Sequence, residues 1–201
     1  MRIPPLAFIH SAVFLFAGAA LAAEPAQKAQ GADIAAMMSA MEKSAALSDA
    51  HKKLKVFEGA WDVSTTLYVK GQPQPGYSGK ADFWSILGDR FVVEDFKGKF
   101  LDKPVASHII FGYDNSKKKY VSVRITSLGT EVMNREGTLS ADGKVLTLTG
   151  ESFDATTNKS AQGRMVYRFE SNDKINVEVY ETKPGAAEVR LFDMAYTRSA
   201  R

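Results

Sequence analysis

The chain has 201 residues and contains 26 Lys and Arg against 23 Asp and Glu, which gives a formal net charge of +3 at pH 7. The basic residues are scattered along the chain, so the clustered positive stripe that nucleic-acid binding requires is absent from the sequence. The chain has no cysteine, which excludes disulfides, a thiol nucleophile and a cysteine-linked lipid anchor. The fold must therefore be stabilised by its own hydrophobic core.

The first 22 residues have the pattern of a signal peptide. Arg2 provides a short positive start, an apolar stretch runs from Leu6 to Leu21, and small residues flank Leu21 where a signal peptidase would cut. An uncleaved membrane helix is the alternative, but the stretch is short, is interrupted by polar residues and has no basic flank. We therefore expect cleavage after Ala22, a periplasmic or secreted location, and no stable membrane anchor on the mature chain.

Residues 23–58 are expected to form a linker and then one or two short helices. The segment 23–32 is small and polar, which predicts a flexible linker. Helical spacing of apolar residues begins at Asp33, a suitable N-cap, and it continues in the helical segment 33–58. Ser48 can cap a second helix that ends near Gly59. The methionine-rich face of the first helix favours packing against the chain's own domain over recruitment of a partner.

From Trp61 onward the sequence alternates apolar and polar residues with a period of two, which is the pattern of β-strands. Separators such as "ADGK" and "KPGAA" are short and rich in turn residues. No helical segment is available to connect parallel strands, so the pattern predicts an antiparallel meander. Strands are expected near residues 61–70, 78–87, 90–99, 105–113, 119–126, 131–140, 144–152, 162–171, 174–182 and 188–198.

An open sheet of about ten strands would leave two unpaired edges, and closure into a barrel removes them. The predicted fold class is therefore mainly β, with a single antiparallel up-and-down β-barrel over residues 59–201 preceded by one or two short N-terminal helices. A two-sheet sandwich is the alternative, although sandwiches usually carry Greek-key connections with longer crossovers.

The start of the first strand resembles that of the calycin superfamily, which includes the lipocalin and nitrobindin-like barrels. A helical turn precedes Gly59-Ala60-Trp61, and the last strand ends with Arg198 in "MAYTRSAR". The resemblance implies that Trp61 closes one end of the barrel and that Arg198 packs across the indole ring. Gly59 would allow the sharp turn from helix to strand.

A second resemblance covers most of residues 50–198. The segments "HKKLKVFEGAWDV", "FGYDNSKKKYVSV", "EGTLSADGKVLTLTGE" and the terminal "YTR" are similar to an uncharacterised bacterial family known as domain of unknown function 1579. Its most specific part is the hairpin that contains Gly112, Tyr113, Asp114 and Tyr120. Many members carry a tryptophan and an aspartate after this hairpin, where this chain has Arg124 and Thr126. The resemblance implies a fold but no activity.

Strand alternation indicates which side chains point into the barrel. With Trp61 inward, Arg198 shares the inward face of the last strand with Arg190, and His108 and Arg124 are further inward candidates. For Arg124 the opposite assignment stays open, in which its hydrophobic neighbours face the core and the arginine faces solvent. The candidate ligand-binding residues are His108, Arg124, Arg190, Phe192 and Tyr196.

The sequence contains no G-x-S-x-G, H-E-x-x-H or P-loop motif, and no catalytic residue is predicted. After removal of the leader only His51 and His108 remain, and two distant histidines do not make a zinc site. No metal or cofactor is therefore expected. Carboxylates such as Glu94 and Asp95 are interpreted as ordinary surface residues of strands. General acid–base catalysis by a buried carboxylate pair stays open, because pairing is not visible in the sequence.

The favoured hypothesis is an exported barrel that binds a small apolar or amphipathic ligand, with an inward arginine meeting its acid group. The alternative is an envelope structural or interaction protein with an unknown protein partner. In that case the barrel would be filled by Trp61, Phe83, Phe91, Phe111, Phe169 and Phe192. A haem binder, for which His108 would be the axial ligand, and a hydrolase are less favoured.

Overall fold

The structure is a computed structural model that describes residues 23–154 and 159–200. The predicted signal peptide, residues 1–22, lies outside the described residues. The chain divides after Ser44 into two compact units, which are a helix and a barrel. None of the helices in the described part of the chain is long and apolar enough to cross a membrane.

The first unit contains helix α1 (Ala23–Ser44), which begins ten residues before the predicted start at Asp33. The segment 23–32 is therefore helical, and its prediction as a linker is corrected. Its Ala, Glu, Gln and Lys residues are good helix formers, and Pro25 lies in the first turn, where a missing N–H is tolerated. The side chains of Met37, Met38 and Met41 are exposed. Their expected packing on the barrel stays a prediction.

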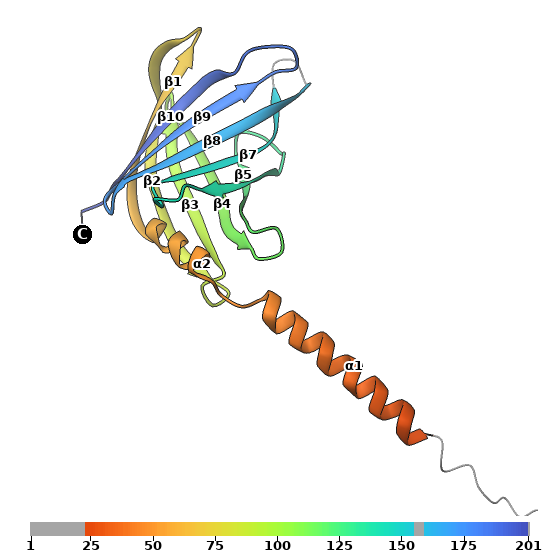
Figure 1. Cartoon of the computed structure of the whole chain (residues 1–201). Coiled ribbons are helices and arrows are strands. Elements are labelled where there is room, and N and C mark those ends of the chain that lie inside the picture. Colours follow the sequence, from red (N-terminus) through yellow and green to blue (C-terminus); the bar gives the residue numbers. More distant parts are fainter. Residues whose placement is uncertain (1–22, 155–158, 201) are drawn as a thin grey trace, which may run out of the picture. The chain divides into compact units, whose positions relative to one another are not determined.

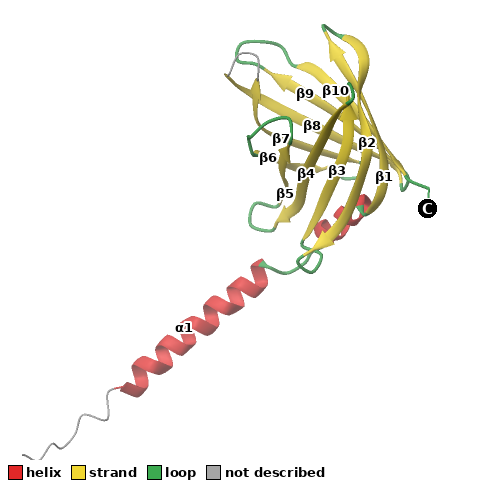
Figure 2. Ribbon diagram, turned by 180° about the vertical axis from the view of Figure 1, so that it is seen from behind, coloured by secondary structure: helices red, strands yellow, loops and turns green. Residues whose placement is uncertain are grey.

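The described strands of the second unit form one closed antiparallel barrel, in which each strand pairs with its sequence neighbours and β1 pairs with β10 (Figures 1 and 2). This confirms the predicted fold class and excludes the sandwich. The strands are β1 (Gly59–Val69), β2 (Gln72–Ile86), β3 (Phe91–Phe100), β4 (Lys103–Asp114), β5 (Lys119–Thr126), β6 (Met133–Leu139), β7 (Val145–Asp154), β8 (Lys159–Ser171), β9 (Lys174–Thr182) and β10 (Val189–Arg198).

Strand β2 is the one that departs most from its predicted bounds, since it begins at Gln72 instead of near residue 78. The segment "KGQPQPG" was expected to be a connection between strands because it is rich in turn residues. In the structure only Lys70 and Gly71 form the turn, both with positive φ. Pairing with β3 starts only at Ser78, so the two prolines lie where one edge of β2 is free of a partner.

Two short helices, α2 (Asp49–Lys53) and the 3-10 helix η1 (Leu54–Phe57), precede the barrel and close one of its ends. Ser48 is the N-cap of α2, and its backbone N–H donates to Nδ1 of His51 over 3.1 Å. Leu54 and Phe57 are both buried. The Phe57 ring stacks on Phe111, with the ring centroids 4.8 Å apart, so η1 plugs what we call the closed end of the barrel.

Trp61 and Arg198 complete the closed end in the way that the calycin resemblance implies. Trp61 is fully buried, and its indole N–H donates to the carbonyl of Phe57 over 2.7 Å. The guanidinium carbon of Arg198 lies 4.2 Å from the centre of the indole ring. Nη1 of Arg198 donates to the carbonyl of Glu58 over 2.8 Å, and Nη2 donates to the carbonyl of Asn172 over 2.7 Å.

Gly59 is required beside this pair for two reasons. Its φ of +114° lies in a region that other residues rarely adopt. A Cβ atom at this position would also lie 2.6 Å from Nη1 of Arg198. The glycine therefore lets the chain turn into β1 while the guanidinium reaches the carbonyl of Glu58.

The hairpin between β4 and β5 carries the residues of the second resemblance. Asp114 accepts hydrogen bonds from the backbone N–H groups of Ser116 and Lys117, over 2.8 and 3.0 Å, which forms the turn. The rings of Tyr113 and Tyr120 meet edge to face, 5.0 Å apart. Gly112 is buried beside the ring of Phe91, and these contacts give the hairpin a structural role.

The interior of the barrel near the closed end is filled by side chains. Inward residues include the rings of Phe57, Phe83, Phe111 and Tyr167, which contact one another. The expectation that Phe91 also fills the interior is wrong. Its neighbours Val92, Glu94 and Phe96 alternate inward on β3, so Phe91 belongs to the outer face.

Candidate functional site

Polar and apolar side chains line a small void inside the barrel, which we call the polar chamber. Its volume is about 10 Å³, which is about the space that one water molecule needs. The chamber is lined by residues from β2, β3, β4, β5, β8 and β10: Tyr77, Glu94, Phe96, Ser107, Ile109, Arg124, Met165, Met194 and Tyr196.

Glu94 is the most deeply buried carboxyl group of the chamber, with 2% of the residue exposed. The hydroxyl of Tyr196 donates to its Oε1 over 3.0 Å. Burial raises the pKa of Glu94 to about 7, against the opposing effects of the Tyr196 hydrogen bond and the charge of Arg124. The Glu94 carboxyl therefore titrates near neutral pH.

Arg124 points into the barrel from β5. Tyr120 and Ser122 are buried on the same face, whereas Val123 and Ile125 are exposed on the outer face. The inward assignment is therefore correct, and the alternative with Arg124 in solvent is wrong. Among the described residues Arg124 has no hydrogen-bond acceptor and no ion-pair partner, although it lines the chamber with Glu94.

Arg135 on β6 is a second inward arginine, and 7% of the residue is exposed. Its Nε atom is buried and has no hydrogen-bond partner. Burial lowers the pKa of Arg135, and the charge of Arg124 lowers it further. The guanidinium lies over Gly163 of β8, where a Cβ atom would come within 3.2 Å of Nη2. The missing side chain of the glycine leaves room for the arginine.

The two arginines are diagonal neighbours on adjacent strands. Ser122 pairs with Arg135, and Arg124 pairs with Met133. In an antiparallel pair such diagonal positions are roughly 7–8 Å apart, within reach of long side chains. Two guanidinium groups are thus held close together inside the barrel without an acid that neutralises either of them by direct contact. A buried charge without a contacting partner is destabilising, and this applies most to Arg135, because Arg124 is half-buried.

Phe192 and Tyr196 lie on the inner face of β10, as the alternation predicts. The Phe192 ring is half-buried, 6.3 Å from that of Tyr77, on the side of the chamber away from the closed end. Tyr196 is buried and reaches Glu94. The structure therefore places Arg124 and Tyr196 around the polar chamber, and Phe192 beside its lining residue Tyr77.

His108 and Arg190 do not join them, and both assignments to the interior are wrong. The side chain of His108 is 52% exposed, and its Nδ1 lies 3.6 Å from a carboxylate oxygen of Asp95 on the outer wall. Ser107 and Ile109 point inward on β4 instead. The prediction assumed that the apolar residues Ala106 and Ile110 face the interior, but they share the outer face with His108. An outward histidine also removes the candidate axial ligand of the haem hypothesis.

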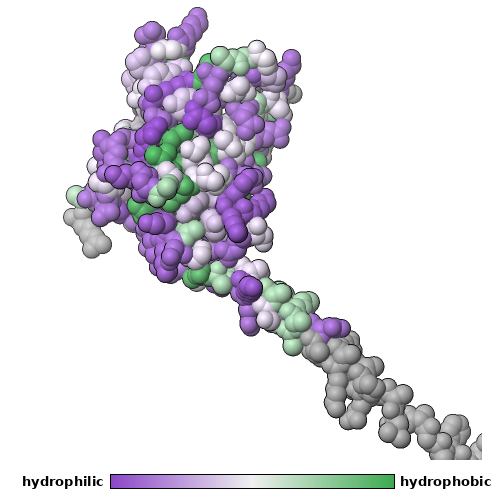
Figure 3. Space-filling model, viewed as in Figure 1, coloured by the Kyte–Doolittle hydropathy of each residue, from purple (hydrophilic) through white to green (hydrophobic). Residues whose placement is uncertain are grey.

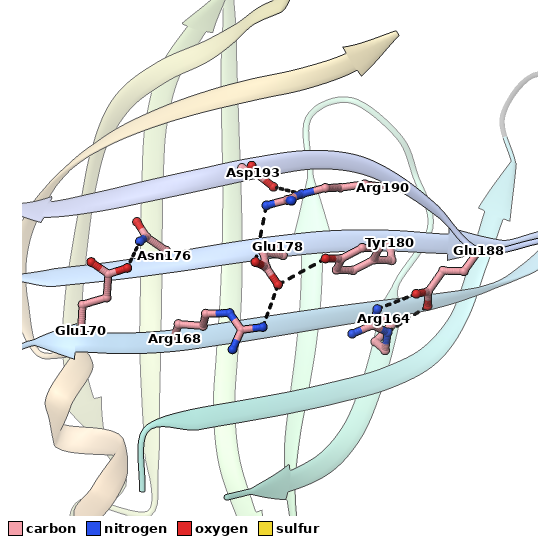
Figure 4. A network of polar contacts seen from close by, with 9 residues as sticks. All are labelled: Arg164, Arg168, Glu170, Asn176, Glu178, Tyr180, Glu188, Arg190 and Asp193. Atoms are coloured by element: carbon pink, nitrogen blue, oxygen red, sulfur yellow. Dashed lines mark hydrogen bonds and ion pairs between the residues drawn. The ribbon is translucent and has the colours of Figure 1, made fainter. Parts of the chain in front are cut away.

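Arg190 is turned outward by an irregularity of the last strand. The register between β10 and β9 shifts between Arg190 and Phe192, which breaks the alternation that was used to place Arg190 inside. Its Nε lies 2.5 Å from Asp193 and its Nη2 lies 3.5 Å from Glu178. Figure 4 shows this ion-pair network on β8, β9 and β10, in which Arg168 also contacts Glu178. The outer arginines therefore have acidic partners, unlike the inner ones.

Hydrophilic residues dominate the face of the barrel shown in Figure 3. A separate groove of about 340 Å³ lies at the closed end, beside α2 and η1. Buried Leu54, Tyr120 and Leu146 form its apolar floor, and Lys52 and Lys53 lie at its rim. The groove is large enough for a small molecule, but no buried polar atom that lacks a partner is among its lining residues.

Glu94 and Arg135 are the site residues that sequence reasoning missed. Glu94 was interpreted as a surface residue because strands at protein surfaces carry carboxylates routinely. The signal that could have found it was the alternation of Val92, Glu94 and Phe96. No group of three or more His, Asp or Glu side chains in the described ranges is placed to hold a metal ion.

Comparison with solved structures supports the fold of the barrel. Rv2717c from M. tuberculosis is similar with a TM-score of 0.57 and 17% identity, over 77% of this chain and 100% of that chain. The S-type phycobiliprotein lyase CPES from Guillardia theta is similar with a TM-score of 0.51 and 11% identity, over 76% of this chain and 93% of that chain. Identities this low show the fold alone.

A third structure, EF1p2_mFAP2b bound to DFHBI, matches with a TM-score of 0.38 and 12% identity, over 74% of this chain and 98% of that chain. No curated protein matches the chain. A family model described as "Protein of unknown function (DUF1579)" matches residues 47–198, which include η1, the whole barrel, the hairpin and both inner arginines. The chain belongs to this family.

Proposed function

We propose that the protein binds a small amphipathic ligand inside the barrel and that Arg124 and Arg135 hold the ligand's anionic group. The proposal rests on one observation: neither of the two inner guanidinium groups forms an ion pair with an acidic side chain of the described residues. Arginine is well suited to carboxylate, sulfate and phosphate groups because its planar donors bind two oxygens at once. A bound anion would supply the missing counter-charge.

The apolar part of the ligand would lie on the side of the chamber away from the closed end. The closed end is filled by Phe57, Trp61 and their neighbours, so it offers no path. On the other side the half-buried residues Phe192 and Tyr77 face the interior. Because the chamber holds about 10 Å³, the space of one water molecule, it must widen to admit an anionic head group, with Phe192 and Tyr77 moving apart.

The comparisons support a ligand-binding role in a general way. One similar barrel is named as a lyase of a phycobiliprotein. The common fold is compatible with a barrel that handles a small molecule, and the arginine pair is the feature of this chain that points to the charge of that molecule. The composition of residues 1–22 supports the further proposal that the protein acts after export, in the periplasm or outside the cell.

Titration with anilinonaphthalene sulfonate (ANS), a fluorescent apolar anion, tests the proposal. The full chain should bind ANS saturably, and Arg124→Gln and Arg135→Gln should each weaken the affinity about 10-fold or more, which is the effect of losing one charge-assisted contact. Arg168→Gln is the matched control, because Arg168 is an arginine of the outer wall with its own acidic partner. Its affinity for ANS should equal that of the natural chain.

Equal affinity in all four proteins would contradict the proposal. It would leave the second candidate function, a barrel filled by its own side chains that serves as an envelope interaction protein. The small volume of the polar chamber is the observation that favours this alternative. Native mass spectrometry of protein purified from its own compartment separates the two, since a retained small molecule supports the first and a co-purified protein supports the second.

A further inference from the structure

The polar chamber contains an internal acid that faces the same space as the proposed anion. Glu94 and Arg124 both line the void, from β3 and β5, yet no direct ion pair forms between them in the described structure. A gap of about one water molecule thus lies among the carboxyl group, the guanidinium and Ser107. An anionic group that occupied this gap would approach Glu94 as well as Arg124.

We propose that Glu94 is an internal counter-ion that competes with the ligand's anionic group for Arg124, so that the barrel holds anions when Glu94 is protonated and releases them when it is ionised. This inference rests on the proposed function. An ionised Glu94 would neutralise part of the charge of Arg124 and would repel an anion placed beside it. A neutral Glu94 would leave the guanidinium free and could donate a hydrogen bond to the ligand.

The surroundings of the Glu94 carboxyl group cause it to ionise near neutral pH. The titratable and charged groups that act on it are Tyr196 on β10, Arg124 on β5 and, in the next position of its own strand, Asp95. Across the interior the phenols of Tyr77 on β2 and Tyr167 on β8 are electrostatically coupled to the same carboxyl group. Tyr77, Tyr167 and Tyr196 all have a raised pKa because they are buried, so they stay neutral while Glu94 titrates.

The direction of the effect follows from linkage. Burial raises the pKa of Glu94 to about 7, so the acid is mostly neutral below this value and mostly ionised above it. Anion affinity should therefore fall as the pH rises through about 7. A bound anion should in return raise the pKa of Glu94 further, because the coupling between proton and anion is reciprocal.

The experiment measures the dissociation constant of ANS for the full chain at about pH 6 and about pH 8. The sulfonate of ANS stays ionised throughout this range, so any change belongs to the protein. The natural chain should bind ANS roughly 5-fold more weakly at the higher pH, which is the change over this range that a one-unit rise of the Glu94 pKa on binding produces. Glu94→Gln should remove this dependence and bind at both pH values with the affinity that the natural chain has at the lower one.

Glu178→Gln is the matched control. Glu178 is an acid of the outer wall in contact with Arg168 and Arg190, so this variant should keep the full pH dependence. A second measurement needs no variant: carbon NMR of the Glu94 carboxyl group should show a higher pKa in the presence of ANS. The NMR titration decides the matter should Glu94→Gln fail to fold.

Two results would overturn the inference, and they are distinct from failure of the proposed function. One is Arg124-dependent ANS binding with the same affinity at both pH values. The other is a pH dependence that survives in Glu94→Gln. Affinity for ANS that is independent of Arg124 and Arg135 at every pH would overturn the proposed function and this inference together.

Discussion

At the scale of single residues, the closed end depends on the contact between Trp61 and Arg198. Trp61→Ala should lower the free energy of unfolding by about 3–5 kcal/mol, because it empties the place of a fully buried indole. Arg198→Lys should also destabilise, since a lysine keeps the charge but cannot stack and donate to the carbonyls of Glu58 and Asn172 together. Urea unfolding of the three proteins measures both effects.

A double-mutant cycle tests whether the two residues act through each other. Trp61→Phe and Arg198→Lys should couple by roughly 0.5–2 kcal/mol, the energy of a cation held over an aromatic ring. Additive losses in the cycle would show that Arg198 contributes independently of the indole, and the calycin-like cap would lose its energetic basis.

Gly59→Ala is predicted to destabilise the same region from the backbone. The positive φ of Gly59 and the approach of Arg198 together should lower the free energy of unfolding by about 1–3 kcal/mol. Gly185→Ala is a suitable comparison, because Gly185 has a similarly positive φ of +75° but nothing within 4 Å of a Cβ atom. Equal losses in the two variants would mean that the contact with Arg198 contributes nothing.

The buried acid also predicts how stability depends on pH. The folded-state pKa of Glu94, about 7, is raised above its ordinary value of 4.5. The resulting stabilisation is complete below about pH 4.5 and is lost as the pH rises through about 7, by roughly 3 kcal/mol at most. Glu94→Gln should lack this loss, so the variant should gain stability relative to the natural chain between about pH 5 and pH 8. Urea unfolding at these pH values measures the difference. A difference in unfolding free energy between the two proteins that does not change with pH would contradict the prediction.

At the scale of secondary-structure elements, helix α2 is expected to depend on its cap. Ser48→Ala should destabilise the barrel unit by about 0.5–2 kcal/mol, because the Ser48 hydroxyl contacts Nδ1 of the buried His51 over 3.0 Å and starts the helix that leads into the plug. Thermal melts measure the loss. Ser116→Ala, in the exposed turn between β4 and β5, serves as the control and should leave the midpoint unchanged.

The elements were the part of the fold that sequence could predict well, because period-two alternation and turn residues act locally. Strands β3 to β10 begin and end within three residues of their predicted bounds. The failures have local causes that the pattern does not contain. Strand β2 extends through two prolines because one of its edges is free, and α1 extends into 23–32 because that segment has residues of high helix propensity.

The candidate site could be predicted only in part, for a different physical reason. Arg124, Phe192 and Tyr196 were placed correctly because alternation continued through their strands. The prediction for Arg190 was wrong because the register of β10 shifts between Arg190 and Phe192, so residues before the shift point to the opposite face from the one that alternation predicts. The surroundings that make Glu94 and Arg135 unusual come from strands far apart in the sequence, so no local pattern could reveal their burial or the missing partners of Arg135.

At the scale of the whole molecule, the fold separates two kinds of arginine. Those on the outer wall, such as Arg164 and Arg168, contact Glu188 and Glu178 and belong to a solvated ion-pair network. Those inside differ: Arg124 lines the polar chamber, Nε of Arg135 is buried without a hydrogen-bond partner, and neither contacts an acid among the described residues. This difference between outer and inner arginines is the basis of the proposal that an anion from outside supplies the counter-charge in the barrel.

The most direct test observes the inner guanidinium groups themselves. In nitrogen NMR spectra of the full chain, the side-chain Nε–H signals can be assigned by comparison with Arg124→Gln, Arg135→Gln and Arg168→Gln. Addition of ANS should shift the signals of Arg124 and Arg135 and leave that of Arg168 in place. Unmoved signals from both inner arginines, while residues around the groove beside η1 respond to ANS, would contradict a ligand site in the barrel.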